Sequence, residues 1–340
     1  MEKNPNIKKK SYLIISVLCL LSIVFYSLFF IWQGIYLPRT LGSQEEVVFS
    51  IQKGDKGKEI AFNLEKEGLI KWSFLFRLYT TLTGDSKKLQ AGEYLLSPSM
   101  TIPEIAQKIV SGETLQIKIT IPEGFTIKQI ENELSLKLQR PVLCQFLAKE
   151  FKNEFDFLKD VPDEANLEGF LFPDTYYFSI GVRDKEICKK FLKNFDQKLK
   201  PELKEEISWQ GKTIFEIMTM ASMIEKEVKT LEDKKLVSGI LWERLEQGMS
   251  LQVDATISYI TGKRTVKILL EDLQIDSPYN TYKYKGLPLG PISNPGLDSI
   301  VAAIYPEESE FWYYLSMPEG ETIFSKTLTE HNIAKAKYLK

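Results

Sequence analysis

Histidine and cysteine are scarce in this sequence. Its 340 residues include one histidine, His331, and three cysteines. Cys19 lies in an apolar run, and Cys144 and Cys188 could pair but form no disulfide framework. So few soft ligands predict no zinc site and no metal cofactor. A serine or cysteine nucleophile would have to rely on His331, and no G-x-S-x-G motif is present. Carboxylate chemistry is the main option that remains.

An excess of one charge sign is also missing. The chain carries 44 basic and 46 acidic residues, for a net charge of -2. This balance gives no indication of a nucleic-acid partner or of binding to an anionic membrane surface.

Charge is absent altogether from residues 11–38, and residues 12–32 are almost wholly apolar. A membrane-spanning helix needs about 20 such residues, which predicts a transmembrane helix at 12–33. Lysines precede it, so residues 1–11 are expected in the cytoplasm and the rest of the chain outside. A cleaved signal peptide is the alternative. Its apolar region would be shorter and end in small residues, whereas this one ends in FFIW.

Beyond the anchor, the pattern indicates an α+β protein with two parts. Residues 34–46 are interpreted as a linker, 47–115 as a small module and 116–340 as a larger domain. A strand, a glycine turn and an amphipathic helix occur in SIQKGDKGKEIAFNL and again, 70 residues later, in TIPEGFTIKQIENEL. Further along the small module, a helix is expected at 72–82, a strand around 91–96 and a helix that begins at 101. In the larger part, helices are expected at 184–206, 212–229, 233–247 and 298–305, with a strand at 311–317.

One glutamate stands out in the helix expected at 212–229. On a helical wheel Glu225 falls on the apolar stripe, whereas Glu227 falls on the opposite side with Glu216, where a carboxylate exposed to solvent is expected. A carboxyl on a core-facing stripe is desolvated, which raises its pKa and suits it to general acid catalysis. The alternative is a structural carboxylate that is paired with an arginine or held by backbone donors.

Two later segments add polar groups that suit a sugar. GMSLQVDATISY places Gln252 and Asp254 among apolar residues, and the long loop 277–296 gathers Tyr279, Asn280 and Tyr282. Sugar rings stack on aromatic faces, and their hydroxyls need paired donors and acceptors. These five residues are therefore candidate substrate contacts in a glycosidase-like site.

Several long motifs then resemble one family. In chain order they are LEGFLFPDTYYF, ASMIEKE, ERLEQGMSLQVDATISY, SPYNTYKYKGLPLGPISNPG and TEHN. The family is that of the endolytic murein transglycosylases (YceG-like), which the chain resembles in these five motifs. The resemblance implies a single-pass cell-membrane protein with a LysM-like module at 47–115 and a catalytic domain at 116–340. It implies cleavage of nascent peptidoglycan strands between MurNAc and GlcNAc to leave 1,6-anhydro-MurNAc ends, without a cofactor. Peptidoglycan synthases are the protein partners that it suggests.

The resemblance also assigns roles to residues. Glu225, the first glutamate of ASMIEKE, would protonate the glycosidic oxygen and then act as base toward the MurNAc 6-hydroxyl. Glu168 is a further candidate substrate contact, and both Glu168 and Asp174 would shape the cleft or cap local backbone. The chain departs from the family pattern at Val253, where a hydroxyl residue is usual, and at Thr322, where a histidine is usual.

Two other functions remain open on the sequence. A lysozyme-like hydrolase would need a second carboxylate about 5–9.5 Å from Glu225, for which Asp254 is the best candidate. A non-catalytic glycan-binding scaffold of the wall-synthesis machinery is the third possibility.

Overall fold

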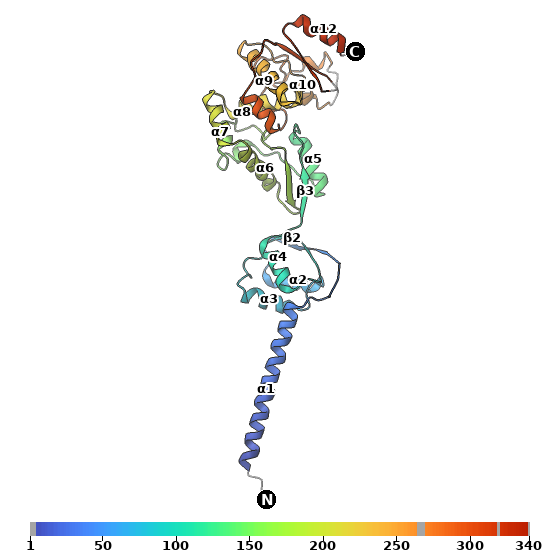
Figure 1. Cartoon of the computed structure of the whole chain (residues 1–340), viewed down its shortest axis with the longest axis vertical. Coiled ribbons are helices and arrows are strands. Elements are labelled where there is room, and N and C mark those ends of the chain that lie inside the picture. The colour runs from blue at the N-terminus through green and yellow to red at the C-terminus, as the bar shows by residue number, and fades with distance from the viewer. Residues whose placement is uncertain (1–4, 264–268, 318–319, 339–340) are drawn as a thin grey trace. The chain divides into compact units, whose positions relative to one another are not determined.

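The computed structural model describes residues 5–263, 269–317 and 320–338. The chain divides into two compact units: residues 1–117 with 179–181, and residues 118–178 with 182–340. Helices and short strands are mixed in both, which confirms the predicted α+β class (Figure 1).

The first unit begins with the long helix α1 (Pro5–Tyr36), drawn in blue in Figure 1. Its segment Ile14–Tyr36 is long and apolar enough to cross a membrane, and the most apolar stretch of 18 residues in it is not buried by the rest of the protein. The helix runs three residues into the expected linker because no helix breaker occurs before Pro38. Ile35, in this last turn, is only 5% exposed and belongs to the core of the small module.

The module itself contains β1 (Val47–Ile51), α2 (Gly57–Lys66), α3 (Ser73–Leu82), β2 (Gly92–Leu96) and α4 (Ile102–Ser111). Strands β1 and β2 are antiparallel, with Phe49 opposite Tyr94. Both side chains are buried, and each such large apolar side chain stabilises the fold by about 1.5–3 kcal/mol. Thr101 caps α4, since its side chain accepts a hydrogen bond from the Glu104 amide. The strand and helices expected here are all present.

The second unit starts around β3 (Gln116–Thr120), α5 (Ile127–Leu138) and β4 (Thr175–Ser179), in which β3 pairs with β4. The helix expected at 184–206 is in fact two helices, α6 (Asp184–Lys198) and α7 (Pro201–Trp209). The prediction of one helix is wrong because Pro201 cannot continue α6 but fits the first position of a new helix.

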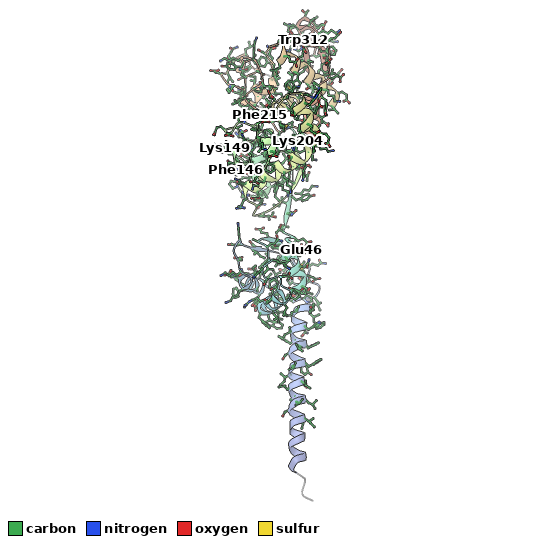
Figure 2. The ribbon with its side chains drawn as sticks, turned by 90° about the vertical axis from the view of Figure 1, so that its left-hand side faces the viewer. Glu46, Phe146, Lys149, Lys204, Phe215 and Trp312 are labelled. Atoms are coloured by element: carbon green, nitrogen blue, oxygen red, sulfur yellow. The ribbon has the colours of Figure 1, made fainter. Side chains whose placement is uncertain are left out.

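The centre of the second unit is α8 (Ile214–Glu227). All eight residues from Ile217 to Ile224 are buried, so this helix is covered on every side. The helices α9 (Leu231–Glu246) and α11 (Leu297–Ile304) pack against it. Phe215, labelled in Figure 2, stacks on Phe170 with ring centroids 6.5 Å apart.

Four further elements complete the unit. They are α10 (Asp254–Thr261), β5 (Tyr313–Ser316), β6 (Thr322–Ser325) and α12 (Leu328–Tyr338). Strands β5 and β6 form an antiparallel pair. The strand expected at 311–317 is β5. Helix α10 lies in the segment that carries Gln252 and Asp254.

Candidate active site

The end of α8 carries both glutamates of the ASMIEKE motif. Thr213 caps the start of the helix, and Glu216 returns a hydrogen bond to the Thr213 amide. The helix then continues for 14 residues and ends at Glu227, after which Val228 is extended. Glu225 and Glu227 therefore lie in the last turn, where side chains from neighbouring elements can reach them.

Glu225 is buried and bound by three donors. Its side chain is 9% exposed, and Lys234 of α9, itself 4% exposed, places its ammonium 3.2 Å from Oε2. The same oxygen accepts hydrogen bonds from the Gly296 amide at 3.1 Å and from the Ser299 hydroxyl at 2.5 Å. Gly296 is the N-cap of α11, so the carboxylate also lies at the positive end of a helix. These groups fix the position of the carboxyl.

The helical wheel thus places Glu225 correctly but not its surroundings. The partner is a lysine, and the expected backbone donor is present as well. A buried lysine and a buried glutamate each need the other, because removal of one leaves an uncompensated charge.

Two loops meet at this end of α8. The Ser222 hydroxyl accepts from the Ile292 amide at 3.0 Å, which fixes the loop 277–296 against the helix. Asn294 then exchanges two backbone hydrogen bonds of 2.8 Å with the turn after β3, one with Gly124 and one with Phe125. The turn at Gly124 therefore lies beside Glu225 and Asn294, although it precedes them by about 100 and 170 residues in sequence.

This turn brings a second carboxyl, Glu123, to the site. A methyl group on Gly296 would stand 2.0 Å from Oε1 of Glu123, so only glycine leaves room for this side chain in its present position. Partial burial raises the pKa of Glu123, and the negative charges of Glu225 and Asp298 raise it further, while Lys234 lowers it. Sequence reasoning missed Glu123, since nothing in the local pattern TIPEGFT connects it with α8.

Glu227 does not face solvent, so the prediction for it is wrong. It is half-buried, and burial raises its pKa to about 7. The negative charge of Asp254 raises this pKa as well, by a smaller amount. The Ala255 amide and the Tyr314 hydroxyl, on the side of Asp254 and β5, lower this pKa. The wheel assumed one buried face, but α10 and β5 cover the side of α8 that it assigned to water.

Asp254 and Tyr282 belong to this second carboxyl cluster. The Tyr282 hydroxyl donates a hydrogen bond to Asp254, and Asp254 is exposed. Arg244, which is 5% exposed, holds the surrounding backbone: it donates to the Leu251 carbonyl at 2.9 Å and twice to the carbonyl of Trp312.

Gln252 has an unusual backbone. It is exposed and adopts φ of 54°, in the left-handed region that non-glycine residues rarely enter. Its amide donates to the Thr281 carbonyl at 3.1 Å, and the next amide, of Val253, donates to the Thr281 hydroxyl at 3.0 Å. Strained residues of this kind concentrate at ligand sites, which supports a functional role for Gln252.

Asn280 is fully buried and organises the long loop. Its Nδ2 donates to the carbonyls of Leu273 and Ile275 at 3.0 and 2.9 Å, and its Oδ1 accepts from the Tyr282 amide at 3.0 Å. In this conformation its amide group supports Tyr282 and does not face solvent.

Glu168 is also buried, at 4% exposure. It accepts from the Ile127 amide at 3.0 Å, at the start of α5, and from Asn294 Nδ2 at 2.8 Å. Burial raises its pKa to about 8, although these hydrogen bonds and one from Tyr259 lower it. Tyr279 packs against Tyr259, with the two ring centroids 5.1 Å apart.

The remaining residues singled out in the sequence have partners other than Glu225. Thr322 donates to Asp233 at 3.1 Å, and the ring of His331 stacks on Tyr313 at 5.4 Å. Asp174 accepts from the Thr175 amide, as a local backbone cap does. Within residues 5–263, 269–317 and 320–338, no group of three or more possible metal ligands occurs.

The fold and the site together define a mixed α+β protein with an apolar N-terminal helix and a cluster of buried and half-buried carboxyls. The chain belongs to the YceG-like family, whose model matches residues 49–337.

Similar proteins agree with this assignment. The chain is 35% identical to the endolytic murein transglycosylase of Bacillus subtilis, over 89% of this chain and 87% of that protein. It is 31% identical to the protein of the same name from Streptococcus pneumoniae, of which it spans 60% of the length. A crystal structure of a protein described as YceG-like from Listeria monocytogenes is similar over 86% of this chain and all of that chain, with 33% identity and a TM-score of 0.58.

Proposed function

We propose that this protein is a membrane-anchored endolytic murein transglycosylase. It cleaves peptidoglycan glycan strands between MurNAc and GlcNAc and leaves 1,6-anhydro-MurNAc ends. Relatives of that name and the family support the reaction. The observation that carries the assignment of the site is Glu225, a carboxylate that three donors fix at the end of the central helix.

The reaction requires two proton movements and no water. One proton reaches the glycosidic oxygen as its bond to the MurNAc C1 breaks, and one leaves the MurNAc 6-hydroxyl as O6 closes onto C1. A single carboxyl can do both in turn, or two carboxyls can divide them, and Glu225 is the residue that we assign to this exchange. Fixed donors hold it in place, so little reorganisation is needed when substrate arrives.

Substrate contacts fall to the exposed groups of the second cluster. We assign Gln252, Asp254 and Tyr282 to sugar hydroxyls, since Gln252 and Asp254 are exposed and Tyr282 binds Asp254. Tyr279, Glu168 and Asn280 support them, because Glu168 and Asn280 are buried and Tyr279 packs against Tyr259.

The rest of the molecule would bring this site to the wall. The proposal includes a cytoplasmic N-terminus at 1–11, a single pass through the cell membrane and an extracytoplasmic domain, because lysines precede the apolar run. The small module at 47–115 would be a LysM-like glycan-binding unit, and peptidoglycan synthases would be partners that supply nascent strands.

Replacement of Glu225 tests the proposal. Glu225→Gln removes the exchangeable proton, so the rate of anhydro-MurNAc formation from purified glycan strands should fall by at least about 10²-fold. Mass spectrometry of the products measures it. Glu246→Gln, an exposed change at the end of α9, is the matched control and should keep the wild-type rate.

The products also separate the alternatives. Reducing ends from the wild-type protein would indicate a hydrolase, and absence of any cleavage would indicate a glycan-binding scaffold. Full activity of Glu225→Gln with an unchanged melting curve would refute the assignment of the site.

A further inference from the structure

Glu123 has a defined position although its side chain is exposed. The turn that carries it is held on both sides: the Gly124 amide donates to the Asn294 carbonyl at 2.8 Å, and Lys226 donates to the Gly124 carbonyl at 3.3 Å. The backbone of Glu123 is therefore fixed relative to α8 and to the loop that ends at Gly296.

The two carboxyls converge on Gly296. Oε2 of Glu225 is 3.1 Å from the Gly296 amide nitrogen. On the Cα of the same residue, a Cβ would meet Oε1 and Cδ of Glu123 at 2.0 and 2.2 Å. Glu123 and Glu225 thus both lie against Gly296, and any side chain at position 296 would displace the carboxyl of Glu123 from its present position.

Their environments are unequal. The side chain of Glu225 is 9% exposed and is held by the Lys234 ammonium, the Gly296 amide and the Ser299 hydroxyl. Glu123 is exposed to solvent, where substrate can reach it, but partial desolvation and the negative charges of Glu225 and Asp298 raise its pKa, against the opposing charge of Lys234. Neighbouring carboxyls whose environments differ in this way commonly divide the roles of acid and base.

We propose that Glu123 is a second catalytic carboxyl, which donates the proton to the glycosidic oxygen while Glu225 accepts the proton of the MurNAc 6-hydroxyl. The inference rests on the proposed function. The electron pair of the O6–H bond passes to O6, which forms the bond to C1. The pair of the broken C1–O4 bond stays on O4 and takes the Glu123 proton. Transfer of one proton from Glu225 back to Glu123, directly or through water, restores the starting state.

The first test is the pH dependence of cleavage in the full-length protein. An acid and a base give a bell-shaped profile, in which Glu123, as the acid, sets the decline of activity at high pH. Glu123→Gln should lower kcat by about 10²-fold with little change in KM, and its profile should lose the decline at high pH. Glu123→Asp keeps an acid, so it should keep that decline at a reduced rate.

The second test uses a leaving group that needs no proton. A MurNAc-terminated oligosaccharide with 4-nitrophenol at C1 expels a stable anion. Glu123→Gln should therefore release nitrophenol at close to the wild-type rate, whereas Glu225→Gln should remain slow. Glu246→Gln is the control on both substrates, and melting curves show that each variant is folded.

Three results would overturn the inference. One is wild-type activity of Glu123→Gln on glycan strands. Another is an equal loss on both substrates with the pH profile unchanged, which would make Glu123 a positioning residue. A third is failure of the folded Glu123→Asp variant to keep the decline at high pH. Formation of anhydro ends by the wild-type protein in any of these cases would leave the proposed function intact, whereas their absence would refute that function itself.

Discussion

At the residue scale, Glu168 should make the stability of the protein depend on pH. Its pKa is about 8 in the fold against an ordinary 4.5, so the native state holds a proton that the unfolded chain releases. The resulting stabilisation is fully present below about pH 4.5 and is lost as the pH rises through about 8. Glu227, with a pKa of about 7, acts in the same direction.

Melting of the full-length protein in detergent from pH 5 to pH 9 measures this effect. Wild-type stability should decline by a few kcal/mol over the range, and Glu168→Gln, which mimics the protonated acid, should flatten the decline. The exposed change Glu246→Gln should follow the wild-type curve. Equal slopes for all three proteins would show that Glu168 is ionised in the fold.

Single residues also mark how far the sequence alone can lead. Glu225 is predictable because three residues of its own helix, Ile214, Met218 and Ala221, share its face. Glu227 is not, since the elements that cover it, α10 and β5, lie about 30 and 90 residues further along the chain. Glu123 and Lys234 escape for the same reason: the contacts that matter are between segments remote in sequence, and no local periodicity records them.

At the scale of elements, the start of α11 sets the spacing of the two carboxyls. Gly296→Ala should force the Glu123 side chain aside, and since the obstructed atoms are the tip of a flexible chain, the fold should lose less than about 1 kcal/mol. Cleavage should fall more steeply, by about 10–100-fold, because a displaced group loses its alignment with substrate.

Gly181→Ala is the matched control. No atom lies within 4 Å of a methyl group at that position, so the variant should keep wild-type stability and cleavage. Rates and melting curves of both variants are the measurement. If Gly296→Ala cleaves as fast as Gly181→Ala, the position of Glu123 is unimportant for the reaction.

Elements were easier to predict than their contacts. Periodicity located α2, α3, α8, α9 and α11 within a few residues, because each buries an apolar face. The error at α6 and α7 came from one proline within a continuous charged pattern, which periodicity does not detect. Strand β6 has only four residues, too few for a pattern, and depends on its partner β5.

At the scale of the whole molecule, topology is the main prediction. A reporter fused after residue 340 that is active only outside the cytoplasm should be active in living cells, because the lysine excess lies before α1. A reporter that is active only inside the cytoplasm should be silent at the same position. The opposite pattern would contradict the orientation.

The junction of α1 with the small module limits which strands this protein can handle. Ile14–Tyr36 rises about 35 Å, little more than the hydrocarbon thickness of about 30 Å, and its last turn is already packed in the module. Gly34 lies so close to Leu75 that a methyl group would stand 2.2 Å from that side chain. With no tether at this point, the module stays beside the membrane. Under the proposed function, the glycan that it binds has to come to the membrane, so the age of a strand, measured by its distance from the site of synthesis, becomes a criterion of selection.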